Sequence, residues 1–461
     1  MLKVLSMVVV VVGALPEYCG RMDDVSALVV LEAVEGMELV QVQVVTRHGA
    51  RTPAAPCQDY LPVAGKLKWN ECTPESRFVE TMEKSFLSFA RTFESGSTSL
   101  GGSCACGQLI DAGVHQMRSL GGALRQAYAS GPESTVQHVF PLTEKKKIYA
   151  RTSDLSRTRA SAEALLSGLL ELSDEPIILE TTDFSEDWIY PNEAKCPELT
   201  LAKRNAYEAD LEFFQWNATA RNALDDRFRT LFPDGYTFGD DMAGSHLLDC
   251  VLSAVCVGKG DRLYDSSEQD FQSLLKDFTA YAEALEYQKL RFDNAKYSML
   301  AAAPLLRRVL EKASSRDRDH FVVWSGHDTT VMPFKVALGI DDHTKWAPYA
   351  DAVVLEIWQQ NNSSKFLRVI TSTGPQTLIG CHGPLCPLDQ ILQTTNTWMH
   401  DDASCRTEVP LLQEELPPWR LRRAIHHETP TRTTFVVLVA SLALTIQFAM
   451  GFAVGRHFTS T

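Results

Sequence analysis

The sequence predicts an α/β core with a mostly helical second lobe. Short β-branched runs alternate with stretches of helical periodicity, and a helix-rich segment at about residues 196–290 interrupts that alternation. The chain of 461 residues, 45% of them hydrophobic and 22% charged, is globular in composition and long enough for a two-lobed catalytic domain with extra segments. Its formal net charge of −14 argues against nucleic acid as a partner, because phosphate backbones require basic surfaces.

The individual elements follow from hydrophobic periodicity. Residues 38–46, ELVQVQVVT, alternate and are β-branched, as in a strand. Residues 320–326, HFVVWSG, form a nearly continuous apolar run, which is typical of a strand buried in an α/β sheet. The other expected elements are helices at 107–128 and 159–172, a short strand at 147–150, a helical run through to residue 313, and hairpin strands at 352–360 and 365–372.

The N-terminus is predicted to be a signal peptide covering residues 1–20. Lys3 precedes an apolar run that is too short to span a membrane, and the cleavage site is ambiguous between Gly13 and Arg21. An uncleaved anchor or a buried strand is the alternative.

Near the C-terminus, residues 435–454 are uncharged and long enough for a helix of about 30 Å. With a signal peptide upstream, they predict a single-pass type I membrane protein whose stem is 406–433 and whose cytoplasmic tail is 455–461. A GPI signal is the rival interpretation, against which the charged ending GRHFTST speaks. The catalytic domain is then lumenal or extracellular, in the endosome, the lysosome or at the cell surface.

Cysteines and sequons agree with a secretory compartment. There are 11 cysteines, and ten remain to form disulfides if Cys19 leaves with the signal peptide. A metal site of Cys104, Cys106 and His115 is the rival to disulfide pairing, but its spacing fits no zinc pattern well. The sequons predict N-glycosylation at Asn217, Asn361 and Asn362.

Charged residues stand where three of the predicted strands end. The clusters are TRHGAR with Arg47, His48 and Arg51, YARTSD with Arg151, and WSGHD with His327 and Asp328. Taken singly, each could be a solvated turn or a helix cap. Ligands in open α/β sheets lie at the carboxyl ends of the strands, so adjacent strands would bring the six residues into one crevice.

These residue types suit phosphoryl transfer. Arginine forks match phosphate oxygens, and nearby positive charge keeps a histidine neutral and therefore nucleophilic. Asp328 could carry the proton that a leaving alcohol takes. We expect no metal and no cofactor, because arginines can supply the charge that magnesium supplies elsewhere.

The three segments also carry a family resemblance. VVTRHGARTP (44–53) matches R-H-G-x-R-x-P, and WSGHDTTVMPFKVALG (324–339) and RTSDLSRTRASA (151–162) are similar to two further signature segments. The chain therefore resembles the histidine acid phosphatases, which are branch 2 of the histidine phosphatase superfamily, from about Val42 to Cys405. The lysosomal and prostatic types are the most similar in layout, including membrane-bound members of protozoa.

The resemblance implies a phosphoglycerate-mutase-like α/β/α sandwich over residues 38–405 and hydrolysis of phosphate monoesters at acid pH. His48 would form a phosphohistidine, and Asp328 would protonate the leaving group. Arg47, Arg51, Arg151 and His327 would bind the phosphate, whereas Arg157 and Asp154 are interpreted as orienting or structural. Dimers are common in this family, so a homodimer is an open partner prediction.

The same resemblance implies two disulfides, Cys381–Cys386 and Cys196–Cys405. A third family bridge lacks its partner because Ala352 stands near the expected cysteine, and Cys250 and Cys256 are close enough to pair locally instead. Four further cysteines surround an insertion and allow three pairings: Cys57, Cys72, Cys104 and Cys106.

Three alternative functions remain. Phosphoglycerate-mutase-like transfer uses the same residues, but it belongs to a cytosolic branch. A phytase would need a lysine-rich pocket for its polyanionic substrate, and no lysine cluster is obvious near the three segments. A catalytically silent membrane glycoprotein could use the same fold for binding, although all six positions are intact here.

Overall fold

The computed structural model describes residues 17–20, 33–72, 100–128, 148–170, 177–238, 244–264, 268–315, 319–340, 345–361, 364–399 and 405. Most of the predicted signal peptide, the stem, the span at 435–454, the tail and Asn362 lie outside these residues. Within them, no helix combines the length and the apolar character that a membrane crossing requires.

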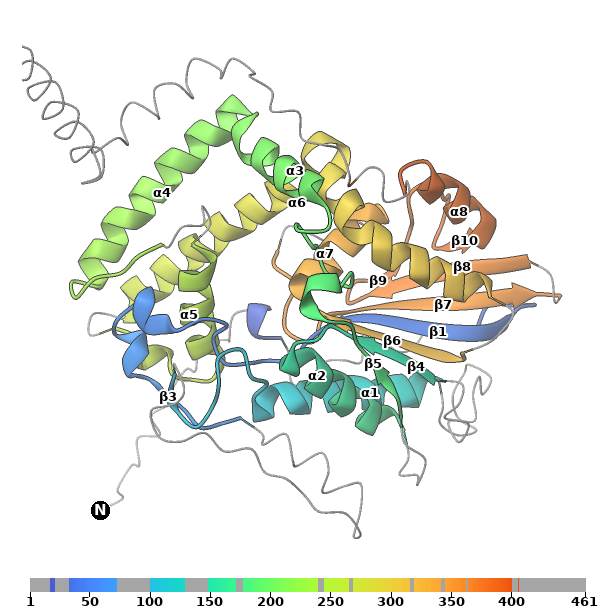
Figure 1. Ribbon diagram of the computed structural model, residues 1–461, viewed down its shortest axis with the longest axis horizontal. Helices are drawn as coiled ribbons and strands as arrows, with labels where there is room; N and C mark the ends of the chain where they lie inside the picture. The colour runs from blue at the N-terminus through green and yellow to red at the C-terminus, as the bar shows by residue number, and fades with distance from the viewer. Residues whose placement is uncertain are drawn as a thin grey trace, which may run out of the picture. The chain divides into compact units, whose positions relative to one another are not determined.

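A mixed sheet of eight strands forms the centre of the described fold (Figure 1), in the order β10-β8-β7-β1-β6-β4-β5 with β9 paired to β8. β1, β6, β4 and β5 are mutually parallel, whereas β7 runs antiparallel to β1 and begins the meander to β10. The strands are β1 (Glu38–Arg47), β4 (Ile148–Thr152), β5 (Leu179–Glu180), β6 (Phe321–Gly326), β7 (Ala352–Gln360), β8 (Ser364–Thr371), β9 (Gly374–Gln376) and β10 (Leu385–Pro387). A separate two-stranded pair joins β2 (Lys68–Trp69) to β3 (Gly101–Gly102).

β1 is the central strand and is buried on both faces. Its alternation of glutamine and valine therefore does not mark a solvent face. The Gln43 amide instead donates to the Val309 carbonyl at 2.9 Å, and its oxygen accepts from Trp324 Nε1 at 3.0 Å. These hydrogen bonds satisfy polar groups that burial would otherwise leave without partners.

Helices cover both faces of the sheet, which gives the three layers of an α/β/α sandwich (Figure 1). α1 (Asp111–Tyr128) and α2 (Ser156–Leu169) pack on one face against Val42 and Val44 of β1. The second half of α6 (Glu268–Ser314) and the short helix α7 (Asp328–Ala337) cover the other face. α8 (Leu388–Asn396) lies beside β8 and β10.

The helical lobe agrees with the segment expected at 196–290. It contains α3 (Pro197–Glu208), α4 (Leu211–Leu231), α5 (Ser245–Cys256) and the first half of α6 (Glu268–Ser314). The helical run to residue 313 is not continuous, because Phe292 to Ala295 leave helical geometry and three of them have positive φ. α6 is thus two helices, one for each lobe.

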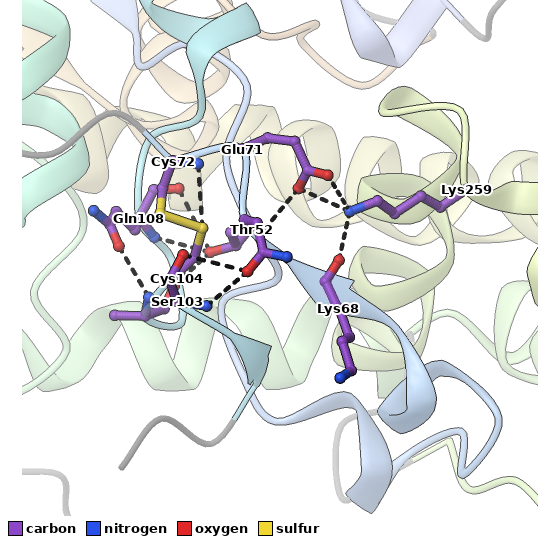
Figure 2. The surroundings of a disulfide bond; sticks show 10 residues. Thr52, Lys68, Glu71, Cys72, Ser103, Cys104, Gln108 and Lys259 are labelled. Atoms are coloured by element: carbon purple, nitrogen blue, oxygen red, sulfur yellow. Dashed lines mark hydrogen bonds and ion pairs between the residues drawn. A yellow bond between two sulfur atoms is a disulfide. The ribbon is translucent and has the colours of Figure 1, made fainter. Parts of the chain in front are cut away.

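Five disulfides connect the described residues: Cys19–Cys256, Cys57–Cys250, Cys72–Cys104, Cys196–Cys405 and Cys381–Cys386. The last two are the pairs that the resemblance implies. Figure 2 shows Cys72–Cys104, beside which Lys259 of the helical lobe binds the Glu71 carboxylate at 2.7 Å and the Lys68 carbonyl at 2.6 Å. The insertion is therefore fastened to the helical lobe by charge as well as by covalent bonds.

Two cysteine predictions are wrong in this structure. Cys250 and Cys256 both lie in α5, where a separation of six residues corresponds to about 9 Å of rise, beyond the reach of a disulfide. They bind Cys57 and Cys19 instead. Cys19 is thus part of a disulfide in this structure, whereas the prediction from the sequence leaves it out of the pairing. The cleavage site of a signal peptide stays a prediction.

The glycosylation sites also differ from expectation. Asn217 is only 6% exposed, and its side-chain oxygen accepts a hydrogen bond of 2.7 Å from the Tyr281 hydroxyl. A glycan needs an exposed asparagine nitrogen, so the structure speaks against modification there. Asn361 lies exposed in the turn between β7 and β8, where glycosylation stays a prediction.

We expect non-reducing peptide mapping of the purified chain to recover Cys19 linked to Cys256 and Cys57 linked to Cys250. Both links join segments that pack together in the fold, so they should form in any folded molecule. Reduction before digestion is the control, since it should abolish both linked peptides. A Cys250–Cys256 peptide would contradict the pairing.

Candidate active site

The parallel pairing of β1 with β6 creates the site. The register places Arg47 beside Gly326, and the His48 N–H donates to the Gly326 carbonyl at 3.0 Å. His48 and His327 therefore leave adjacent strand ends together, with ring centroids 5.6 Å apart. Two segments separated by most of the chain thus meet at the carboxyl edge of the sheet, as ligand sites in such folds do.

His48 is buried and held in one tautomer. Its Nδ1 lies 2.8 Å from the Gly49 carbonyl oxygen, which can only accept, so the neutral ring carries its proton on Nδ1. Burial and the positive charges of Arg157, Arg47 and Arg51 hold the pKa of His48 well below its usual value. The Nε2 atom consequently keeps a lone pair even in acid, which a nucleophile needs.

Gly49 allows the backbone after β1 to approach α1 closely. A Cβ atom at this position would lie 2.4 Å from the Gly113 carbonyl oxygen of α1, closer than atoms can approach. Because any side chain would push β1 away from α1, the glycine sets the position of His48 at the strand end.

Arg47 and Arg51 are fixed by carboxylates from different parts of the chain. Arg47 Nη2 lies 3.1 Å from Asp328 Oδ2, and Arg51 Nη1 lies 2.9 Å from Asp249 Oδ1 of α5. These ion pairs use the outer nitrogens of each guanidinium. The Nε atoms of Arg47 and Arg51 remain buried without a hydrogen-bond partner.

Arg157, in the first turn of α2, completes the cationic cluster. Burial and the charge of Arg51 lower its pKa to about 10. Among the nearby charges, it is the one that most lowers the pKa of both His48 and His327. Its Nε is also buried without a partner, so three guanidinium donors around the histidines await an acceptor.

His327 and Asp328 form the opposite wall. His327 Nε2 is 2.8 Å from the Ser153 hydroxyl, and burial with the charge of Arg157 lowers the pKa of His327 well below its usual value. Burial alone would raise the pKa of Asp328, but Arg47 and the hydrogen bond from Trp346 Nε1, at 2.9 Å, hold it well below its usual range. The Asp328 carboxyl is thus ionised next to Arg47.

The structure places Arg151 elsewhere than predicted. β4 continues to Thr152, so Arg151 lies inside the ladder opposite Trp324 rather than in the loop after it. Its guanidinium pairs with the buried Asp187 at 2.8 Å and lies 5.0 Å from the Trp188 ring centroid. Its Nη1 is buried without a hydrogen-bond partner. Phosphate binding by Arg151 therefore stays a prediction, and Arg157 is a further candidate for that role.

Four other residues of the site were missed from the sequence: Tyr18, Asp249, Trp346 and Tyr349. Arg157 did have a local signal, because it stands in the first turn of a helix that directly follows a strand. Asp249 lies in the helical lobe, and Tyr18 lies in a stretch that was predicted to be a signal peptide. No local pattern in the sequence therefore marked either residue as part of the site. Among the described residues, His, Cys, Asp and Glu side chains form no group of three that could hold a metal ion.

Comparison with known proteins identifies the family. The model of the histidine phosphatase superfamily (branch 2) matches residues 38–372. The chain belongs to this family. The match includes all three strand-end segments and the helical lobe, so both walls of the site fall within it.

The relatives of this chain include two kinds of phosphatase. Lysophosphatidic acid phosphatase type 6 of Mus musculus is 26% identical over 387 residues, covering 80% of this chain and 88% of that protein. Lysosomal acid phosphatase of Rattus norvegicus is 26% identical over 321 residues, covering 63% and 69%.

Solved structures share the fold. A Bifidobacterium longum multiple inositol polyphosphate phosphatase, in complex with inositol hexasulfate, has a TM-score of 0.54 at 12% identity over 81% of this chain and 95% of that chain. The phytase of Hafnia alvei with myo-inositol hexakis sulphate has a TM-score of 0.51 at 16% identity over 81% and 99%.

We predict that Arg157→Gln and Arg151→Gln separate phosphate binding from stability. Loss of Arg157 removes a charge-assisted donor and should weaken inorganic phosphate binding by about 10-fold or more with little change in Tm. Loss of Arg151 leaves Asp187 buried without its partner, and should lower Tm while phosphate binding by the folded protein stays within about 2-fold. Calorimetric titration measures phosphate binding, and thermal unfolding measures Tm. Weaker phosphate binding by Arg151→Gln with unchanged binding by Arg157→Gln would show that Arg151, and not Arg157, binds phosphate.

Proposed function

We propose that this protein is an acid phosphatase that hydrolyses phosphate monoesters through a phosphohistidine at His48. The observation that carries the proposal is a buried, neutral imidazole whose Nε2 lone pair is available beside three guanidinium Nε–H groups without acceptors. A tetrahedral anion supplies acceptors in that geometry and compensates the positive charge. Membership of a family that includes acid phosphatases supports the same chemistry.

In the first step, His48 Nε2 attacks phosphorus and the ester P–O bond breaks. Arg47, Arg51 and Arg157 bind the phosphoryl oxygens, and Asp328 donates its proton to the leaving alkoxide. In the second step, water attacks the phosphohistidine, the P–N bond breaks, and the Asp328 carboxylate takes the proton from that water. Inorganic phosphate leaves and both side chains return to their starting states.

The charge of the substrate explains how a strong acid can serve as the proton donor. Asp328 is ionised in the unliganded site because Arg47 pairs with it. A phosphate group that binds Arg47 brings negative charge close to Asp328, which raises the pKa of that carboxyl. Activity should fall as pH rises through this pKa, whereas His48 stays neutral on the acid side.

We propose a small monoester rather than a polyanion as the substrate. The buried lysines of the described residues each have a carboxylate partner: Lys259 with Glu71, Lys289 with Glu286, and Lys335 with Asp351. They are therefore not available to the additional phosphates of an inositol polyphosphate. Lysophosphatidic acid, named in one group of relatives, is a monoester to test first.

We place the catalytic domain in a lumenal or extracellular compartment. Five disulfides among the described residues support an oxidising environment. Single-pass anchoring by residues 435–454 and residence in the endosome, the lysosome or at the cell surface belong to the same proposal.

The first test is hydrolysis of p-nitrophenyl phosphate from about pH 4 to pH 8, with and without EDTA. We expect an EDTA-resistant optimum at about pH 5, because the proton donor must be protonated while His48 remains neutral. His48→Ala should abolish activity, and His115→Ala, which changes an exposed histidine of α1, should not. An active His48→Ala variant would rule out the phosphohistidine.

A second test concerns the proton donor. In Asp328→Asn, we expect alkyl phosphates to lose about 10²-fold to 10⁴-fold in kcat, because their alkoxides need a proton to leave. p-Nitrophenyl phosphate should lose much less, since its phenolate leaves unprotonated. Equal losses for the two substrate classes would mean that Asp328 acts only on binding.

A further inference from the structure

The segment Glu17–Gly20 packs against the active site. Its 3-10 turn η1 (Glu17–Cys19) is joined to α5 by the Cys19–Cys256 disulfide. The Tyr349 N–H donates to the Tyr18 carbonyl at 3.1 Å. Gly20 has a φ of +69°, and a Cβ there would lie 2.4 Å from the Tyr349 carbonyl oxygen, so the turn is tight. These contacts fix the segment at Tyr18, Cys19 and Gly20.

The Tyr18 side chain contacts Arg47 in two ways. Its hydroxyl accepts a hydrogen bond of 2.8 Å from Arg47 Nη2, and its ring centroid lies 4.7 Å from Cζ of the same guanidinium. The Tyr349 ring is also close, at 4.3 Å from Cζ, and contacts Tyr18 edge to face. Two aromatic rings and a hydroxyl therefore stabilise a fully buried cation.

These contacts determine which donors Arg47 can offer to a ligand. Nη1 donates to the Ala347 carbonyl, while Nη2 is shared between the Tyr18 hydroxyl and Asp328. Because the guanidinium is planar, fixing both outer nitrogens also fixes the direction of the Nε–H that lacks a partner. Asp328, the proposed proton donor, contacts the same Nη2 atom of Arg47 as the Tyr18 hydroxyl.

We propose that Tyr18, held in place by Cys19–Cys256, is a positioning residue that aims Arg47 at the phosphate. The site then depends on an intact disulfide although neither cysteine touches substrate. This inference rests on the proposed function, because Arg47 must bind a phosphate for its orientation to matter. α5 carries both Cys256 and Asp249, so one helix of the second lobe fixes Arg47 through Tyr18 and Arg51 directly.

The test compares four variants of the full chain. Tyr18→Phe removes the hydroxyl alone, and Tyr18→Ala also removes the ring. Cys19→Ala with Cys256→Ala releases the segment, and Gly20→Ala displaces it while the disulfide remains. The matched control is Cys381→Ala with Cys386→Ala, a disulfide that joins the segment before β10 to that strand.

We expect Tyr18→Phe to raise KM and the inhibition constant of inorganic phosphate by about 5-fold, which is the effect of losing one hydrogen bond to a charged group. The other three variants should raise both constants by about 10-fold or more. The control disulfide variant should keep both within about 2-fold. A purely structural role would lower the amount of active enzyme but leave KM and the inhibition constant of the remaining molecules unchanged, which would overturn the inference.

Direct binding separates this inference from the proposed function. Inorganic phosphate is titrated into His48→Ala with and without Tyr18→Ala, so that no turnover is required. Binding that weakens with Tyr18→Ala supports the inference, and equal binding overturns it. A wild-type protein that neither hydrolyses a monoester nor binds phosphate would instead contradict the proposed function. Tyr18→Phe and Gly20→Ala retain every disulfide, so the test does not depend on the folding of the cysteine variant.

Discussion

The rest of this structure depends on the positive charge that surrounds the buried imidazole of His48. Arg47, Arg51 and Arg157 surround His48, and Arg47, Arg51 and His48 are buried. Such a cluster needs partners for its buried guanidiniums, because an unpaired buried charge is strongly destabilising. Much of the architecture serves this need, and the charge that remains uncompensated is available to a ligand.

The partners come from all parts of the chain. Asp328 arrives with β6 and α7, Asp249 with the helical lobe, and Tyr18 with a segment ahead of β1. The helical lobe therefore takes part in holding the site together. Its α5 fixes one of the arginines by an ion pair and a second one through a disulfide and a tyrosine.

The sequence predicted what is local in this site. A strand that ends in charged residues is a short pattern in the sequence. The strands β1 and β6 and the positions of His48 and Asp328 at their ends could therefore be predicted from the sequence, and the family resemblance agreed with them. The predicted end of the strand before Arg151 was wrong, because β4 extends to Thr152 and so includes Arg151. Tyr18 and Asp249 contact the arginines through tertiary structure, which leaves no periodic pattern in the sequence. The two cysteines of α5 are close in sequence, but helix geometry keeps them apart, so each pairs with a distant cysteine.

The connectivity of β1 also constrains the order in which the protein can assemble during synthesis. β1 is made early, yet its two neighbours in the sheet are β6 and β7, which end at Gly326 and Gln360. The disulfides of α5 span 237 and 193 residues and become available once Cys256 has emerged. A nascent chain can therefore join its helical lobe to the Tyr18 segment before the sheet exists, and His48 receives its neighbours last. Truncation between Cys256 and β6 would leave a disulfide-linked polypeptide with His48 at the end of an unpaired strand, which is a substrate for chaperones rather than an enzyme.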